Sequence, residues 1–257
     1  MKEEIFIYFI GTAGSGKSTL TETVKKWVKL RGLDAIIVNL DPGAENLPYT
    51  PDVDIRDWIS LKEVMETNKL GPNGAQIACA DMIALNTDEI KKSIEHFKSD
   101  YILVDTPGQL ELFVFRESGK YTVSFLSPEK SIICYLIDPM LARTASGFVS
   151  QLLLAITTNF RLSQPQINVL SKADMVPKKE SEIILKWSKD PYEINEALMG
   201  EEPTIYREMS EGILQLIKDF GGHTALIPVS KKNQYGINDL YTAIQLQYAG
   251  GEDLTKD

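Results

Sequence analysis

Gly11-Thr-Ala-Gly-Ser-Gly-Lys-Ser-Thr19 is the most informative segment of this 257-residue chain. It follows an apolar run over residues 5–10 and precedes a segment of helical periodicity over 18–30. The pattern G-x-x-x-x-G-K-[ST] between a strand and a helix is typical of a loop whose backbone N–H groups bind a polyphosphate. We predict that seven residues of this loop bind a nucleotide: Gly11, Gly14, Ser15, Gly16, Lys17, Ser18 and Thr19. Lys17 would contact the β- and γ-phosphates, and the Ser18 hydroxyl would be a ligand of Mg²⁺.

Short apolar runs alternate with longer amphipathic segments along the whole chain, which is the pattern of βαβ units. Several of the short runs are almost continuously apolar, as expected of strands buried on both faces of a parallel sheet. The predicted fold class is α/β: a doubly wound, mostly parallel sheet of the P-loop NTPase type, similar to a G domain and carrying helical insertions. We predict strands over 5–10, 35–40, 101–104, 132–137, 167–170 and 225–229, and helices over 18–30, 147–160, 210–220 and 237–248.

One domain over residues 1–257 is expected, because no linker rich in Gly or Ser divides the chain. Two spacers between predicted strands exceed a minimal crossover, residues 41–100 and about 175–203. The first holds helical pieces over 57–68 and 75–97, and the second is charged and interrupted by proline. Insertions of this size are helical decoration or functional loops.

Composition excludes several classes of protein. The 27 basic and 36 acidic residues give a formal charge of −9 without a dense basic cluster, so we expect no direct nucleic-acid partner. No apolar run approaches the roughly 20 residues of a membrane span. Cys79 and Cys134 lie far apart and are expected to be buried in a reducing compartment. We therefore expect a cytoplasmic protein without membrane contact.

Asp105 directly follows the apolar run 101–104 and opens the segment Asp105-Thr-Pro-Gly-Gln-Leu-Glu111. A carboxylate at the carboxyl end of a strand beside a phosphate loop can hold Mg²⁺ through its water shell. Gly108 would direct its backbone N–H to a γ-phosphate, and Gln109 and Glu111 would orient or polarise the attacking water. A simple turn that closes a strand is the alternative, and the phosphate loop favours the functional interpretation.

Asp41 also ends a predicted strand, within Asn39-Leu-Asp-Pro-Gly43. It is a candidate for a second carboxylate near Mg²⁺ or the attacking water. The alternative is an aspartate that only forms a turn or caps a helix.

The tetrapeptide SKAD at residues 171–174 follows another predicted strand and is a variant of N-K-x-D. In that element the aspartate, here Asp174, accepts hydrogen bonds from the N1–H and 2-amino groups of guanine. Adenine lacks this pair of donors, so ATP would leave the carboxylate unpaired. Lys172 would cover the plane of the base, and the backbone N–H groups around Val229 and Ser230 would meet guanine O6. We therefore expect GTP rather than ATP.

These motifs together resemble those of the GPN-loop GTPases. The matching segments, in the order of the family, are 11–19, 39–43, 71–73, 105–111, 171–174 and 228–230. The resemblance implies Mg²⁺-dependent GTP hydrolysis by a homodimer, in which the Gly71-Pro-Asn73 segment enters the neighbouring subunit's site. Asn73 would then offer a neutral amide to the transferring phosphoryl group in trans, in place of an arginine. Ser171 departs from the pattern, since asparagine is usual there.

The resemblance also implies that Asp41, Gln109 and Glu111 lie near the attacking water and the metal. Together with Lys17 and Asn73 they are the predicted catalytic residues. Eukaryotic members of the family are linked to RNA polymerase assembly, and a protein client of that kind is implied here by family analogy only. Three alternatives stay open: a related P-loop ATPase, a nucleotide-dependent assembly factor with negligible hydrolysis, and a metal-delivery GTPase. The last is disfavoured by two scattered cysteines and two histidines.

Overall fold

The computed structural model describes residues 4–126, 129–219 and 225–248. Within these residues, parallel strands form one sheet in the order β3-β2-β4-β1-β5-β6-β7. The strands are β1 Ile5–Gly11, β2 Ala35–Asn39, β3 Val53–Asp54, β4 Tyr101–Asp105, β5 Ser131–Ile137, β6 Gln166–Leu170 and β7 Leu226–Pro228. All six predicted strands are confirmed, and so is the α/β fold class. The sequence did not predict β3, a two-residue strand at one edge of the sheet.

β1 lies at the centre of the sheet between β4 and β5, and all its residues are buried. Side chains at alternate positions point to opposite faces of a strand. Phe6, Tyr8 and Ile10 accordingly belong to one hydrophobic cluster, whereas Ile5 and Phe9 belong to the other. This central position brings the loop after β1 to the middle of the carboxyl edge of the sheet, where ligands bind in open α/β folds.

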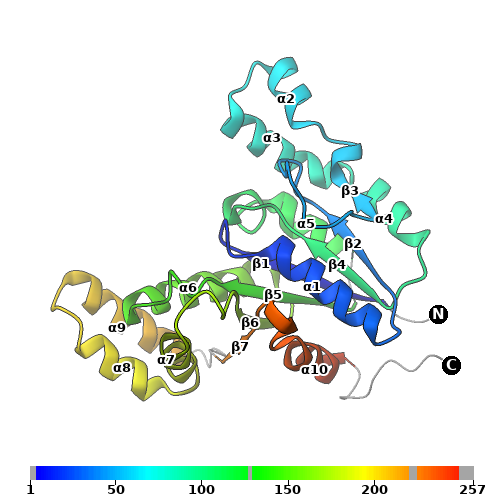
Figure 1. The fold of residues 1–257 in the computed structure, drawn as a ribbon. Coiled ribbons are helices and arrows are strands. Elements are labelled where there is room, and N and C mark those ends of the chain that lie inside the picture. Colours follow the sequence, from blue (N-terminus) through cyan, green and yellow to red (C-terminus); the bar gives the residue numbers. More distant parts are fainter. Residues whose placement is uncertain (1–3, 127–128, 220–224, 249–257) are drawn as a thin grey trace.

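The helices pack on both faces of the sheet (Figure 1). They are α1 Lys17–Leu30, α2 Leu61–Asn68, α3 Pro72–Leu85, α4 Thr87–Glu95, α5 Glu117–Leu126, α6 Ala145–Leu162, α7 Lys178–Lys189, α8 Pro191–Met199, α9 Ile205–Asp219 and α10 Ile237–Tyr248. Side chains of α1 and α10 fill one cluster, and those of α3 to α6 contribute to the other. None of the helices in the described ranges is long and apolar enough to cross a bilayer.

The predicted helices over 18–30, 147–160 and 237–248 are confirmed as α1, α6 and α10. The segment 210–220 is the second half of α9, and its last residue lies outside the described ranges. The prediction of one helical piece over residues 75–97 was wrong. The chain leaves helical geometry at Asn86, with φ −106° and ψ 10°, and the Asn86 side chain donates to Met82 O at 2.9 Å. Two helices, α3 and α4, therefore occupy this segment.

The two insertions predicted from the sequence hold helical structure. β3, α2, α3 and α4 lie within residues 41–100, and α7 and α8 lie within 175–203. Figure 1 shows α2 and α3 standing out from the sheet at one end of the molecule, with α7, α8 and α9 grouped at the other. The assignment of the whole chain to one domain stays a prediction.

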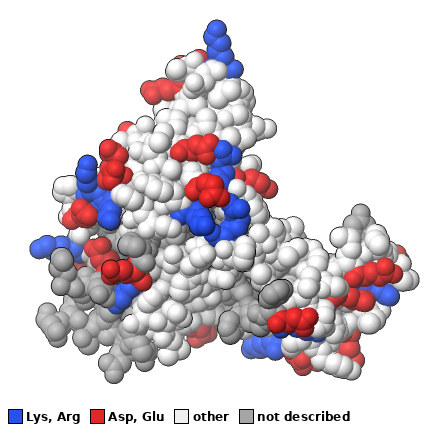
Figure 2. All heavy atoms as spheres, turned by 180° about the vertical axis from the view of Figure 1, so that it is seen from behind, with Lys and Arg blue, Asp and Glu red and all other residues white. Residues whose placement is uncertain are grey.

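The cysteines, the residues near α5 and the surface charge complete the description of the fold. Cys79 and Cys134 are free thiols and both are buried, as predicted. Most apolar residues near α5 pack into the core, although Phe115 and Tyr121 are exposed. On the face seen in Figure 2, basic and acidic side chains are interspersed, so that face presents no continuous basic surface.

Candidate active site

The loop between β1 and α1 has the backbone geometry that its glycines predict. Gly14 and Gly16 have φ angles of 75° and 96°, in the left-handed region that glycine adopts most easily. A Cβ on Gly11 would lie 2.7 Å from both the backbone oxygen of Leu136 and Ser15 Oγ. Gly16 is the N-cap of α1, so the loop ends at a helix N-terminus, where backbone N–H groups favour an anion.

Lys17 is buried at the start of α1 and connects two segments of the site. Its ammonium donates to Gly11 O at 2.9 Å, Thr12 O at 3.0 Å and Gly108 O at 2.9 Å, which uses all three of its donors. Burial lowers the pKa of Lys17 to about 8, while the charge of Asp105 opposes that change. Lys17 therefore holds the segment after β4 against the phosphate loop.

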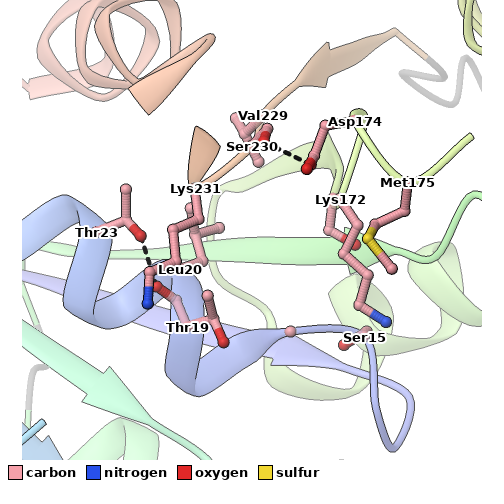
Figure 3. A pocket seen from close by; sticks show the side chains of 12 residues that line it. Ser15, Thr19, Leu20, Thr23, Lys172, Asp174, Met175, Val229, Ser230 and Lys231 are labelled. Carbon is pink, nitrogen blue, oxygen red and sulfur yellow. Dashed lines mark hydrogen bonds between the residues drawn. The ribbon is translucent and has the colours of Figure 1, made fainter. Parts of the chain in front are cut away.

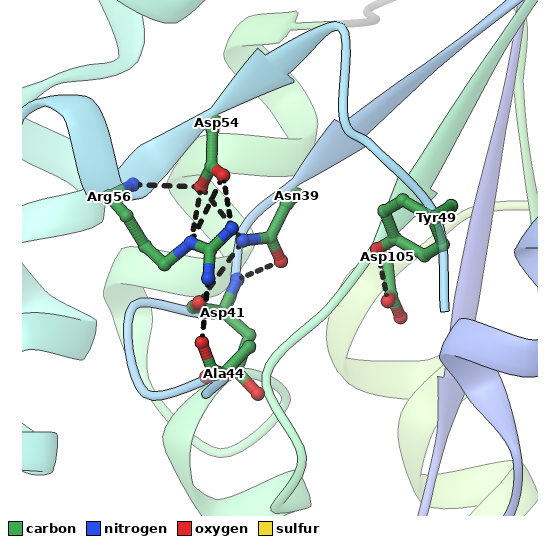
Figure 4. A network of polar contacts seen from close by, with 7 residues as sticks. All are labelled: Asn39, Asp41, Ala44, Tyr49, Asp54, Arg56 and Asp105. Atoms are coloured by element: carbon green, nitrogen blue, oxygen red, sulfur yellow. Dashed lines mark hydrogen bonds and ion pairs between the residues drawn. The ribbon is translucent and has the colours of Figure 1, made fainter. Parts of the chain in front are cut away.

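Asp105, the last residue of β4, is 1% exposed. The Tyr49 hydroxyl donates to its Oδ2 (Figure 4), whereas Oδ1 has no hydrogen-bond partner among the described residues. Burial raises the pKa of Asp105 to about 6, while the hydrogen bond from Tyr49 and the nearby Ser18 hydroxyl oppose that change. A buried acceptor without a partner costs free energy, so Oδ1 is suited to a hydrated cation or another donor.

Asp41 lies directly beside the segment that follows β4. Its Oδ1 accepts from the backbone N–H of Gly43 at 2.9 Å, and its Oδ2 accepts from that of Gly108 at 3.1 Å. Burial raises the pKa of Asp41, although both backbone hydrogen bonds oppose this. The Asp41 carboxylate thus occupies the N–H group of Gly108 that the sequence assigns to a γ-phosphate.

A polar network holds the Asp41 segment against the edge strand β3 (Figure 4). The Arg56 guanidinium pairs with Asp54, with Nη2 at 2.6 Å from Oδ2, and Nη1 donates to Ala44 O at 2.8 Å. Asn39 donates through Nδ2 to Asp54 at 2.9 Å, and its Oδ1 accepts from the Asp41 N–H at 3.0 Å. The sequence did not mark Tyr49, Asp54 and Arg56 as site residues, because they belong to no motif and their partners are set by tertiary contact.

The structure also fits the Mg²⁺ that the sequence predicts. Among the described residues, no group of three or more His, Cys, Asp or Glu side chains forms a metal cage. Mg²⁺ beside a nucleotide needs none, since it is usually held by one or two carboxylates together with phosphate oxygens and water. The free Oδ1 of Asp105, with the Ser18 hydroxyl beside that carboxylate, satisfies this requirement.

A pocket of about 290 Å³ lies beside the phosphate loop (Figure 3). One wall consists of the phosphate loop and the first turns of α1, and the other consists of the segments after β6 and β7. Asp174 and Ser230 come from those two segments, and the Ser230 hydroxyl donates to Asp174 Oδ1 at 2.5 Å. The structure therefore brings the predicted base-binding residues Lys172, Asp174, Val229 and Ser230 to the phosphate loop.

Ser171, the departure from N-K-x-D, also lines this pocket. It is buried, and its hydroxyl donates to Ile137 O at 3.1 Å. The side chain therefore ties the element to the end of β5.

Three predicted catalytic residues are exposed. Gln109 and Glu111 lie at the start of the short 3₁₀ helix Leu110–Leu112. Asn73 is in the first turn of α3, after the N-cap Gly71 and Pro72, where the sequence allowed a tight turn. Figure 1 shows the turn between α2 and α3 well apart from the β1–α1 loop. Within one chain, Asn73 is therefore not brought to the phosphate loop.

Known proteins are similar to this chain in sequence. A family model described as "Conserved hypothetical ATP binding protein" matches residues 9–250. GPN-loop GTPase 3 of Danio rerio is 32% identical over 95% of this chain and 88% of its own length. GPN-loop GTPase 1 of Dictyostelium discoideum is 29% identical over 95% of this chain, which spans only 62% of that protein.

A solved structure agrees with these relatives. The GTPase PAB0955 from Pyrococcus abyssi, in its apo form, is 28% identical and superposes with a TM-score of 0.85 over 95% of this chain and 98% of its own. The family model, the curated relatives and the shared fold agree with one another. The chain belongs to the GPN-loop GTPase family.

Proposed function

We propose that this chain binds Mg²⁺·GTP and hydrolyses it to GDP and phosphate. The observation that carries the proposal is the pocket in which Asp174 and Ser230 face the phosphate loop that holds Lys17. Relatives named GPN-loop GTPases and a solved GTPase of the same fold support it.

The phosphates would be held by the backbone N–H groups of residues 11–16 and by Lys17. Lys17 now donates to three carbonyl oxygens, so phosphate oxygens would replace some of these acceptors. The γ-phosphate would compete with Asp41 for the N–H of Gly108. Ser18 and Asp105 would hold Mg²⁺, with Asp41 nearby, and the bound ion would neutralise negative charge on the phosphates.

The attacking water would be oriented by Asp41, Gln109 and Glu111. Phosphoryl transfer depends chiefly on positioning and electrostatic stabilisation, so a strong general base is not required. Asn73 would complete the site from a second copy of the chain, in a homodimer. Its exposed place on the projecting α2–α3 pair supports this role.

Guanine is proposed as the base, although the matching family model is described as ATP binding. The Asp174 carboxylate at the pocket supports this choice, since adenine offers no matching pair of donors. An ATPase is the second candidate, and its support is the description of the family model. We further propose a cytoplasmic location and a protein client, without a direct nucleic-acid partner.

Phosphate release from GTP and from ATP, measured with and without Mg²⁺, tests the proposal. We expect release from GTP that requires Mg²⁺, weak release from ATP, and loss of activity in Lys17→Ala. Lys29→Ala is the matched control, because Lys29 is an exposed lysine on the same helix. No steady release by the unmodified chain would favour an assembly factor with negligible hydrolysis. Equal release by Lys17→Ala would refute the assignment of the site.

The role of Asn73 in trans has its own test. Lys17→Ala and Asn73→Ala chains should each be poor enzymes as homodimers. After mixing, a heterodimer would contain one site with Lys17 from one chain and Asn73 from the other, so part of the activity should return. Exchange of subunits is verified by mass measurement of differently tagged chains. Proven exchange without recovered activity would contradict action in trans.

A further inference from the structure

Asp138, which no motif in the sequence marks, contacts a residue of the base pocket. It directly follows β5, and its side chain is only 12% exposed. Its Oδ2 accepts from Lys172 Nζ at 2.8 Å, and its Oδ1 accepts from the backbone N–H of Met140 at 2.9 Å. The carboxylate is thus fixed by the backbone on one side and pairs with Lys172 on the other.

Lys172 is held at its backbone as well as at its ammonium. Its φ of 49° lies in the left-handed region, and the preceding N–H, that of Ser171, donates to Ile137 O at 3.0 Å. A Cβ built on Gly16 would lie 3.5 Å from Lys172 Cε, so the stem of the lysine runs over the end of the phosphate loop. Figure 3 shows the same placement, with Lys172 extending across the pocket towards Ser15.

A lysine in this place has two physical costs. Ordering a long, flexible side chain lowers its conformational entropy. This loss weakens ligand binding unless the side chain is already ordered before the ligand binds. A second ammonium near the phosphate loop also repels Lys17, whose pKa is lowered mainly by burial and to a lesser degree by the charge of Lys172. Asp138 reduces both effects. It holds the Lys172 ammonium in place before a ligand binds, and its negative charge balances the positive charge of that ammonium.

We infer that Asp138 is a positioning residue for nucleotide binding, which holds Lys172 over the phosphate loop before the base enters. The inference rests on the proposed function, because it takes the pocket to be the base site. Asp138 does not reach the reacting phosphate in this scheme. Its removal should therefore weaken GDP and GTP to the same extent and leave the chemical step unchanged.

Calorimetric titration of the full chain with GDP and with a non-hydrolysable GTP analogue tests the inference. Asp138→Asn keeps the shape of the side chain and an oxygen for the Met140 N–H, but it loses the charge that pairs with Lys172. We expect the Kd for both nucleotides to rise about tenfold, with kcat for GTP within about twofold of its original value. Glu193→Gln is the control, because it removes the carboxylate of another lysine–carboxylate ion pair, a more exposed one with Lys186 between α7 and α8, whose residues do not line the pocket.

A double-mutant cycle separates positioning from a general structural effect. In a Lys172→Met background, Asp138→Asn should weaken GDP binding by less than about twofold, since the partner is already gone. An unchanged Kd in a folded Asp138→Asn chain, or an equal loss in both backgrounds, would overturn the inference. If Asp138→Asn does not fold, the Kd for GDP is measured in Lys172→Met alone, and we expect it to rise. An unchanged Kd in Lys172→Met would also overturn the inference. Failure of the unmodified chain to bind guanine nucleotides would instead refute the proposed function.

Discussion

Replacing Asp105 by asparagine should stabilise the nucleotide-free protein. Burial raises the pKa of this carboxyl from 3.8 to about 6, so holding it ionised in the folded chain is unfavourable at pH 7.5. A shift of that size corresponds to about 3 kcal/mol of unfolding free energy. Asparagine has the same shape, still accepts from Tyr49 and carries no charge. We expect Asp105→Asn to raise the unfolding free energy by about 1–3 kcal/mol.

The order of stability should reverse when Mg²⁺ and a GTP analogue are added. The unmodified chain should gain about 4.1 kcal/mol at a ligand concentration one thousand times its Kd, which exceeds the advantage of about 1–3 kcal/mol expected for nucleotide-free Asp105→Asn. Asp105→Asn should gain much less, since it has lost the buried carboxylate proposed to hold the metal. Urea unfolding at pH 7.5, with and without Mg²⁺ and the analogue, measures both effects, and Asp88→Asn, an exposed aspartate on α4, is the control. A nucleotide-free Asp105→Asn chain no more stable than the original would refute this reasoning.

Two further predictions concern pH and packing. Because folded Asp105 keeps its proton up to about pH 6 and the unfolded chain loses it near 3.8, its contribution to stability should fall as pH rises from 4 to 6. Urea unfolding across this range should show the fall in the unmodified chain relative to Asp105→Asn, and parallel curves would contradict it. Gly119→Ala should lower the unfolding free energy by about 3 kcal/mol, since its Cβ would lie 2.0 Å from Phe113 O. Gly212→Ala on α9, whose Cβ would meet nothing within 4 Å, should be neutral or slightly stabilising, and equal effects of the two substitutions would contradict the packing argument.

The fold could be predicted from the sequence because several of its strands are almost continuous apolar runs with turn or polar residues at their ends. The residues of the site could be predicted from the sequence for a related reason. Asp105 and Asp174 lie at or shortly after the end of a predicted strand, and Lys17 begins the helix after the loop that follows another. Parallel strands bring their carboxyl ends to one edge of the sheet. The proximity of Asp174 to the phosphate loop could therefore be predicted without knowledge of any side-chain contact.

The remaining features depend on contacts that no local pattern encodes. β3 is too short for a periodic signal, and the apolar spacing that supports one helix continues across Asn86 into α4. Tyr49 and Arg56 come from the first insertion, where only the folded chain shows that they meet Asp105 and Ala44. Asp138 likewise gains a meaning only once Lys172 is seen beside it.

Guanine recognition by Asp174 is tested most sharply by kcat/KM for GTP and for XTP, measured in the unmodified chain and in Asp174→Asn. Guanine offers two hydrogen-bond donors to the Asp174 carboxylate. Xanthine has an oxygen where guanine has its amino group, and the amide of an asparagine can donate a hydrogen bond to that oxygen. We expect a strong preference for GTP in the unmodified chain and a reversal towards XTP in Asp174→Asn, with kcat largely kept. An unchanged preference for GTP in Asp174→Asn would contradict the assignment of this pocket as a guanine site.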